Sequence, residues 1–131
     1  MPGQDTSTYA NEKGFDILSS INPGEGFWVN NLLSKQVLIA GTPVEDNLTM
    51  IQGWNLMGLK SNQTKSITAL ISGNETKIIS IWKWVDKWAV CILGDEDSGL
   101  GYATSKGFQF LEEINPGEGF WVNYNEEMTL E

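Results

Sequence analysis

The sequence predicts a mainly β protein, built as a small antiparallel sandwich or barrel with one or two short helices. Three observations support this prediction: short runs rich in aromatic and β-branched residues, turn-forming residues between those runs, and helical segments that are few and short. Because strand-like and helix-like segments alternate, an α+β fold is the alternative. A doubly wound parallel sheet is disfavoured, since parallel strands need long helical crossovers.

A long internal repeat organises the chain. Residues 9–30 read YANEKGFDILSSINPGEGFWVN and residues 102–123 read YATSKGFQFLEEINPGEGFWVN; these two repeat segments are identical at sixteen of twenty-two positions. They lie 93 residues apart, so the 131 residues hold only one whole period. We therefore expect residues 1–50 to be the C-terminal part of a first copy and residues 51–131 a nearly complete second copy, packed together as one globular unit. The chain is expected to be a piece of a tandem array.

Each repeat segment predicts a turn followed by a strand. In Ile-Asn-Pro-Gly-Glu-Gly the proline presets the second turn position, and the glycine after it supplies the positive φ of the third position of a type II turn. The aromatic and β-branched residues that follow predict strands over 27–30 and 120–123. Earlier in each segment, residues 14–21 and 107–114 place Phe, Leu and Ile at helix-like spacing, and we expect one or two helical turns there.

The stretch between the repeat segments supplies the other elements. A strand is predicted over 36–40 and another over 53–59, where apolar residues occur on both faces. Apolar residues at i, i+3 and i+4, followed by a glycine, predict a short helix over 64–71. Residues 78–84 and 88–93 are rich in β-branched residues and tryptophan, which predicts the two strands of a hairpin.

The predicted hairpin brings tryptophan rings together. If residues 86–87 form a two-residue turn, Trp84 pairs with Ala89 and Trp82 with Cys91. The small Ala89 side chain then leaves room above Trp84 for a ligand ring.

The chain has six tryptophans, and they suggest one candidate binding site. Exposed tryptophan faces can stack on sugar rings, which makes three of them a candidate sugar-stacking platform: Trp82, Trp84 and Trp88. The alternative is that these rings build the core of a small domain, where each buries on the order of 200 Å². The other three are assigned to the core: Trp28, Trp54 and Trp121.

Charge and composition exclude several classes of function. The chain has 17 acidic residues against 8 lysines, a net charge of -9, and no arginine or histidine. Without histidine there is no imidazole base and no histidine-bound metal, and without arginine there is no bidentate phosphate clamp. The negative charge argues against nucleic acids and anionic membranes as partners, and no apolar run is long enough to insert in a membrane. We expect no cofactor.

Two acidic features are weaker candidates for chemistry. Asp95 and Asp97 lie in an acidic loop that could offer oxygen ligands to Ca²⁺, but the loop fails the EF-hand pattern. Glu25 and Glu118 could act as the paired carboxylates of a glycosidase, yet they occupy equivalent places in the repeat, which explains their match without catalysis. The single Cys91 excludes an internal disulfide. We therefore assign no metal site and no catalytic residue, and we predict that the chain is not an enzyme.

Four motifs occur in order along the second copy: Gly-Trp-Asn-Leu at 53–56, the helix near 67–71, Ile-Trp-Lys-Trp at 81–84 and Gly-Glu-Gly-Phe-Trp-Val-Asn at 117–123. In this order they resemble a recurrent module of bacterial secreted and cell-surface repeat proteins. The resemblance implies an extracellular or cell-surface location, a non-enzymatic role, and neighbouring domains of the same polypeptide as partners. The prediction is therefore a non-catalytic structural or adhesive module; the alternative is a carbohydrate-binding module that holds a polysaccharide on exposed tryptophans.

Overall fold

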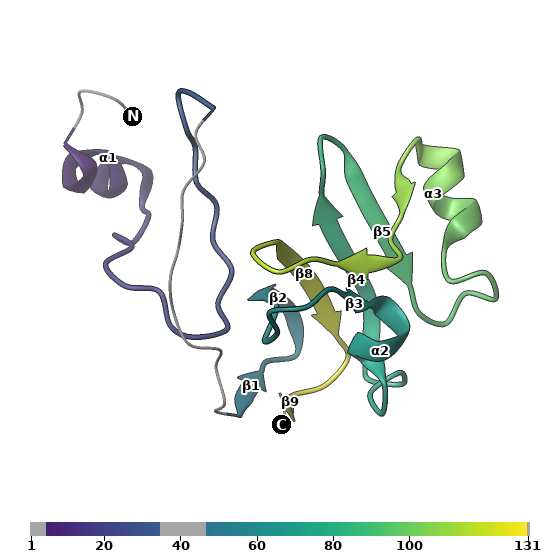
Figure 1. Cartoon of the computed structure of the whole chain (residues 1–131). Helices are drawn as coiled ribbons and strands as arrows, with labels where there is room; N and C mark the ends of the chain where they lie inside the picture. Colours follow the sequence, from purple (N-terminus) through teal and green to yellow (C-terminus); the bar gives the residue numbers. More distant parts are fainter. Residues whose placement is uncertain (1–4, 35–46, 131) are drawn as a thin grey trace.

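Figure 1 shows the computed structural model of the chain, which describes residues 5–34 and 47–130. The fold is mainly β, as predicted, with three short helices among the described residues, and the described strands do not close into a barrel. The main sheet has five strands in the order β2, β8, β4, β5, β6, and only the β5–β6 pair is parallel. Their bounds are Gly53–Gly58 for β2, Gly119–Tyr124 for β8, Ile78–Trp84 for β4, Trp88–Ile92 for β5 and Gln109–Phe110 for β6.

Two short antiparallel pairs lie beside the main sheet. β1 (Leu48–Met50) pairs with β9 (Met128–Leu130), and β3 (Lys65–Ser66) pairs with β7 (Glu113–Ile114). Both pairs join the part of the chain that precedes β4 to the part that follows α3. The β1–β9 pair therefore ties the two ends of the unit formed by residues 47–130 to each other.

Most local predictions for this unit are confirmed. β2, β4, β5 and β8 coincide, within a residue or two, with strands predicted from the sequence. The predicted short helix is α2 (Ile67–Ile71), where the Ser66 hydroxyl oxygen accepts a hydrogen bond from the Ala69 N–H at 3.2 Å and caps the first turn. The strand predicted over 36–40 lies outside the described residues.

The helical turns predicted over 14–21 and 107–114 are wrong, because a helix ends where each was expected to begin. α1 (Thr6–Lys13) and α3 (Leu100–Lys106) are each followed by a glycine in the left-handed conformation, with φ of 69° and 71°. The N–H of that glycine bonds to carbonyls of the last turn, which terminates the helix. Beyond α3 the chain forms the short strands β6 and β7.

The core lies on one face of the main sheet. Phe120, Val122 and Tyr124 of β8 are all at most 2% exposed, and alternate residues of a strand share a face. α2 covers this face through Ile67, and α3 packs against β5. The buried cluster consists of Met50, Met57, Ile67, Ile78, Ile81, Ala89, Cys91, Leu111, Ile114, Phe120, Val122, Tyr124 and Met128.

The two repeat segments share the glycine that ends a helix and the turn, but only the second segment forms strands before and after the turn. Gly24 and Gly117 both have positive φ, 85° and 82°, as predicted for the third turn position. In both turns the glutamate N–H donates to the asparagine carbonyl, at 3.1 and 3.2 Å. After the turn the second segment forms β8, whereas residues 27–30 form no strand, so the strand predicted there is wrong.

The first repeat segment contacts the rest of the chain at the outer edge of β2. The Gly26 N–H donates to the Leu56 carbonyl at 3.0 Å, and the Gly58 N–H donates to the Gly24 carbonyl at 3.1 Å, which makes an isolated antiparallel bridge. In Figure 1 the purple and blue trace of residues 5–34 lies on the side of β2 away from β8. The turn of the first segment thus adds to the open edge of the sheet.

Candidate functional site: a tryptophan face

Five tryptophans share the face of the main sheet that is opposite the core. Register places them together: Trp82 lies opposite Trp121, Trp84 lies opposite Trp88, and Leu56, two residues from Trp54, also lies opposite Trp121. Directly paired residues of neighbouring strands point to the same side of a sheet. We refer to the set as the tryptophan face: Trp54, Trp82, Trp84, Trp88 and Trp121.

Edge-to-face contacts hold the rings of the tryptophan face in place. The ring centres of Trp84 and Trp88 are 5.3 Å apart, and those of Trp82 and Trp88 are 6.0 Å apart. Near α3, Trp82 also meets Phe108 at 5.8 Å and Tyr102 at 6.3 Å, so aromatic rings cover it from this side. Contacts of this geometry contribute beyond the area they bury, and they hold Trp82, Trp84 and Trp88 against one another.

The open part of this face is a shallow hollow of about 500 Å³. It is lined by four of the tryptophans, and the Trp82 indole N–H is not available to it because it donates to the Ser80 hydroxyl oxygen at 3.0 Å. Trp54 and Trp84 are 52% and 48% exposed. The site therefore offers aromatic faces and apolar edges, and its chemistry is that of stacking and apolar contact.

The assignment of three tryptophans to the core is wrong for all three. Trp28 and Trp54 are 61% and 52% exposed, and Trp121 is half-buried on the tryptophan face. The core positions of β8 are taken by Phe120 and Val122, and strand alternation then turns Trp121 to the other side. Trp54 lies on the same face as Trp121, because β2 pairs with β8 and places Leu56, two residues from Trp54, opposite Trp121.

The register predicted for the hairpin is also wrong. The loop between β4 and β5 has three residues, with Asp86 at φ 67° and the Val85 N–H donating to the Lys87 carbonyl at 2.9 Å. Trp84 therefore pairs with Trp88 instead of Ala89. Ala89 points to the core, so it leaves no room above Trp84.

Beneath the sheet, Lys83 and Glu118 form an ion pair that the sequence did not predict. Lys83 is 7% exposed, and its ammonium group lies 2.7 Å from Glu118 Oε2 and 3.0 Å from the Glu113 carbonyl oxygen. Glu118 Oε2 also accepts a hydrogen bond from the Asn115 N–H at 2.8 Å. The signal was the position of Lys83 between Trp82 and Trp84, because alternation sends it to the opposite face.

The ion pair sets the charge state of Glu118. Partial burial of its carboxylate favours the neutral form, but hydrogen bonds from Lys83 and Asn115 and the positive charge of Lys83 outweigh that cost and lower the pKa of Glu118 below its ordinary value. Glu25, at the matching place in the first segment, has its pKa lowered by hydrogen bonds from Asn22 alone. Both turns are thus held by an ionised carboxylate.

The acidic loop before α3 uses one of its carboxylates structurally. Asp97 Oδ1 accepts from the Gly99 N–H at 3.0 Å, and Oδ2 accepts from the Gly101 N–H at 2.7 Å. These bonds hold the loop against the start of α3. Asp95 is the other calcium candidate, and within residues 5–34 and 47–130 no three acidic or cysteine side chains gather as a metal site would require.

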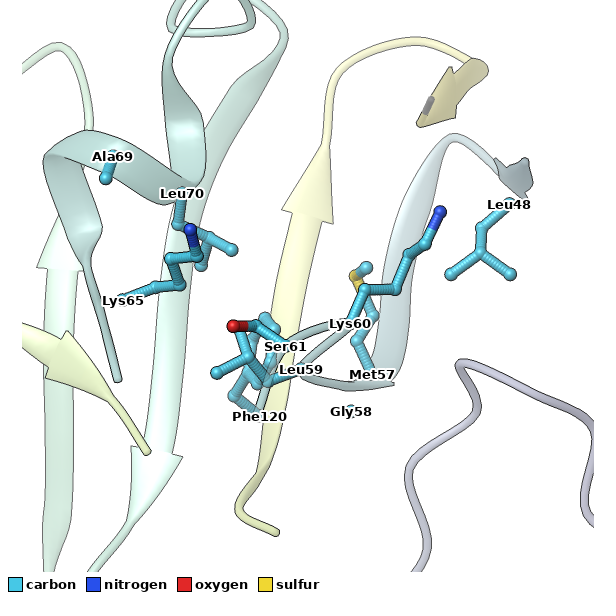
Figure 2. Close-up of a pocket in the computed structure, with 10 residues that line it drawn as sticks. All are labelled: Leu48, Met57, Gly58, Leu59, Lys60, Ser61, Lys65, Ala69, Leu70 and Phe120. Carbon is cyan, nitrogen blue, oxygen red and sulfur yellow. The ribbon is translucent and has the colours of Figure 1, made fainter. Parts of the chain in front are cut away.

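Two further cavities lie beside α2. Figure 2 shows one of about 170 Å³ between the end of β2 and α2, with Leu59, Leu70 and Phe120 among its lining residues; ligand pockets begin at roughly 300 Å³. The other, of about 520 Å³ between α2 and β5, includes buried Cys91. Burial raises the pKa of the Cys91 thiol, so the reactive thiolate is scarce at neutral pH.

Comparison with family models, with curated proteins and with solved structures gives no match to this chain. None of the helices in the described ranges combines the length and the apolar character that crossing a membrane demands. The two features that bear on function are the tryptophan face and the contact of the first repeat segment with β2 of the second copy.

Proposed function

We propose that the chain is a non-catalytic structural module of a tandem-repeat protein, carried on the surface of a bacterium or secreted by it. In this proposal each copy is a spacer or adhesive unit, and its partners are neighbouring copies of the same polypeptide. The resemblance of the second copy to modules of bacterial surface proteins supports the location. The contact of the first repeat segment with β2 of the second copy supports the role.

That contact is the observation on which the proposal depends. The turn of the first segment bonds to the outer edge of β2 through Gly26 and Gly58, and Gly24 lies against the Leu48 side chain. An exposed sheet edge invites uncontrolled pairing with other chains. Covering this edge with the turn of the preceding copy protects it and fixes the direction in which the next unit begins. Repetition of the contact would produce an ordered array.

Glycine at position 26 makes the contact between the first turn and β2 possible, and its substitution tests that contact. A Cβ added to Gly26 would lie 2.8 Å from the Met57 carbonyl oxygen, closer than real side chains approach a backbone atom. Gly119 is its equivalent in the second segment, where the same oxygen is 3.9 Å away. Gly26→Ala should therefore separate the turn from β2, whereas the matched control Gly119→Ala should not.

Hydrogen exchange and solution scattering measure the two outcomes. In Gly26→Ala we expect the Gly58 amide to lose its protection against hydrogen exchange. We also expect the radius of gyration to rise, because the first segment is no longer held against β2. In Gly119→Ala both should stay at the wild-type values. If the Gly58 amide remains protected in Gly26→Ala and the scattering is unchanged, the proposed contact between the first turn and β2 is wrong.

Carbohydrate binding is the second candidate function, and the tryptophan face favours it. Trp54 and Trp84 are about half exposed, and the hollow that Trp54 lines together with Trp82, Trp88 and Trp121 is about 500 Å³, within the size range of ligand sites. Its lining is tryptophan alone, so a bound polysaccharide would be held by the apolar faces of its sugar rings. The hairpin tryptophans proposed from the sequence, Trp82, Trp84 and Trp88, all belong to this face.

Tryptophan fluorescence tests this second candidate. Titration with soluble polysaccharides should give a saturable change that is lost in Trp54→Ala or Trp84→Ala. Trp28→Ala is the matched control, because Trp28 is as exposed but lies outside the tryptophan face. If no polysaccharide changes the emission, or if Trp28→Ala abolishes the change equally, the face is not a sugar-binding site.

A further inference from the structure

The same apolar residues have opposite surroundings in the two repeat segments. Phe120 and Val122 of β8 are 1% and 2% exposed, whereas their equivalents Phe27 and Val29 are 46% and 62% exposed. The contrast extends through the segment: Phe15, Ile17, Leu18 and Ile21 are exposed as well. Six apolar side chains within fifteen residues are thus exposed, and exposed apolar surface that is larger than usual marks an interaction site.

The differences between the segments fall where they do not matter for packing. Six positions differ, and in the second segment they are Thr104, Ser105, Gln109, Phe110, Glu112 and Glu113. Five of these are exposed, and the sixth, half-buried Phe110, corresponds to the apolar Ile17. Every residue of the second segment that is buried has an identical residue in the first. Residues 9–30 therefore carry every buried side chain that the second segment contributes.

The first segment already has the helix end and the turn of the second. The helix-ending glycines have φ of 69° and 71°, and the turn glycines have φ of 85° and 82°. The asparagine N–H donates to the glutamate carboxylate of the turn at 2.7 Å in the first segment and 2.8 Å in the second. A segment ordered in this way loses less conformational entropy when it binds.

The place filled by the second segment is built by other residues. β8 lies between β2 and β4, β6 lies along β5, and Glu118 bonds to Lys83. All of these partners come from residues 47–93. We propose that residues 9–30 bind a second molecule of this chain in the place that its residues 102–123 occupy, between β2 and β4. Within one molecule the turn of the first segment is held on the outer edge of β2, whereas this place is on the inner edge.

In the wild-type chain, the exchange of repeat segments between two molecules is not favoured. Each molecule has one such place and two segments that fit it, so exchange between two wild-type molecules gains no contacts. The tethered second segment also has the advantage of a high effective concentration. A substitution that weakens the packing of the second segment alone should favour binding of the first segment of another molecule between β2 and β4. This inference depends on the two segments and not on the proposed spacer role.

Sedimentation velocity on four full-length chains tests the proposal. Phe120→Ala removes the largest core side chain of the second segment, and a change of this kind typically weakens a core element by about 100-fold or more. We expect Phe120→Ala to form dimers or larger oligomers whose fraction rises with concentration. The double variant Phe27→Ala/Phe120→Ala should stay monomeric, because neither segment then fits better than the other. Wild type and Phe27→Ala should also be monomeric.

Three results would overturn the proposal. The first is a monomeric Phe120→Ala chain at every concentration. The second is equal association of Phe120→Ala and the double variant, which would indicate general adhesion of exposed apolar surface. The third is a Phe120→Ala chain that stays monomeric and is stabilised by Phe27 equally at all protein concentrations. This result would mean that the first segment replaces the second within one molecule. Should Phe120→Ala not fold, the smaller changes Val122→Ala and Val29→Ala provide the same matched set.

Discussion

The ammonium group of Lys83 lies 2.7 Å from Oε2 of Glu118, and this pair fastens the turn of the second repeat segment to the middle of the sheet. The lysine comes from β4 and the glutamate precedes β8, so the bond joins two neighbouring strands. Glu25 occupies the matching place in the first segment, and among the described residues no lysine is within ion-pair distance of it. The pair therefore distinguishes the segment that is built into a sheet from the one that is not.

Lys83→Met should destabilise the unit by about 1–3 kcal/mol, because it removes two hydrogen bonds from a charged donor and leaves the Glu113 carbonyl unpaired. Methionine keeps most of the length and apolar contact of the lysine stem. Lys77→Met is the matched control: Lys77 pairs with Glu126 at 3.5 Å on the surface, where such pairs contribute about 0–1 kcal/mol. Urea unfolding measures both. Equal losses in the two variants would show that the buried pair has no special role.

The stability of the unit should fall in acid partly through Glu118. Its pKa is lowered in the folded state, so between that pKa and the ordinary glutamate value of about 4.3 the unfolded chain binds more protons. The contribution is complete above the ordinary value and is lost as the pH falls through the folded pKa. Glu118→Gln removes the titrating group, so we expect a smaller loss of unfolding free energy between about pH 5.5 and pH 3 than in wild type. Parallel curves for the two proteins would contradict this assignment.

Trp28 and Trp121 are equivalent in sequence, and their replacement should have unequal effects. Trp121→Ala removes a half-buried ring from the centre of the tryptophan face, and we expect a loss of about 2 kcal/mol. Trp28→Ala removes an exposed ring and should change stability by no more than about 0.5 kcal/mol. Thermal unfolding of the two variants gives the comparison directly. A destabilised Trp28→Ala chain would mean that the first segment is packed in solution.

Elements with strong local signals could be predicted from the sequence. The turn glycines, α2 and the strands of the second copy are specified by nearby residues, because turn chemistry and side-chain periodicity act over a few positions. α3 had a local signal too, which is the glycine after Lys106 that ends it. Apolar spacing alone predicts a helix that begins at Gly107, whereas the left-handed conformation of this glycine ends one there.

Local signals do not predict which of two identical residues is buried in a strand and which is exposed. Phe120 lies in a strand between β2 and β4, whereas Phe27 lies in no strand and is exposed. Pairing partners far along the chain decide which of the two conformations is adopted. The tryptophan face has the same origin, since its membership depends on strand register. One residue more in the β4–β5 loop than predicted changes which tryptophans pair.

Gly99 and Gly107 flank α3, and they differ in what surrounds them. Both have positive φ, 85° and 71°, so alanine at either position costs about 1–2 kcal/mol of backbone strain. At Gly107 an added Cβ meets no atom within 4 Å, but at Gly99 it would lie 2.9 Å from the Ile92 Cβ. Gly99→Ala must therefore move α3 away from β5, and with it Tyr102 from Trp82.

We expect Gly107→Ala to lose only the strain energy and to keep the near-ultraviolet circular dichroism of the tryptophan face. Gly99→Ala should lose more stability and should also change that signal, because the edge-to-face contact of Tyr102 with Trp82 is broken. The signal comes from ordered aromatic rings, so it separates a shifted helix from a merely weaker one. If Gly99→Ala keeps the wild-type spectrum, then α3 does not order the tryptophan face, and the rigidity of that face comes from the contacts among the tryptophans themselves.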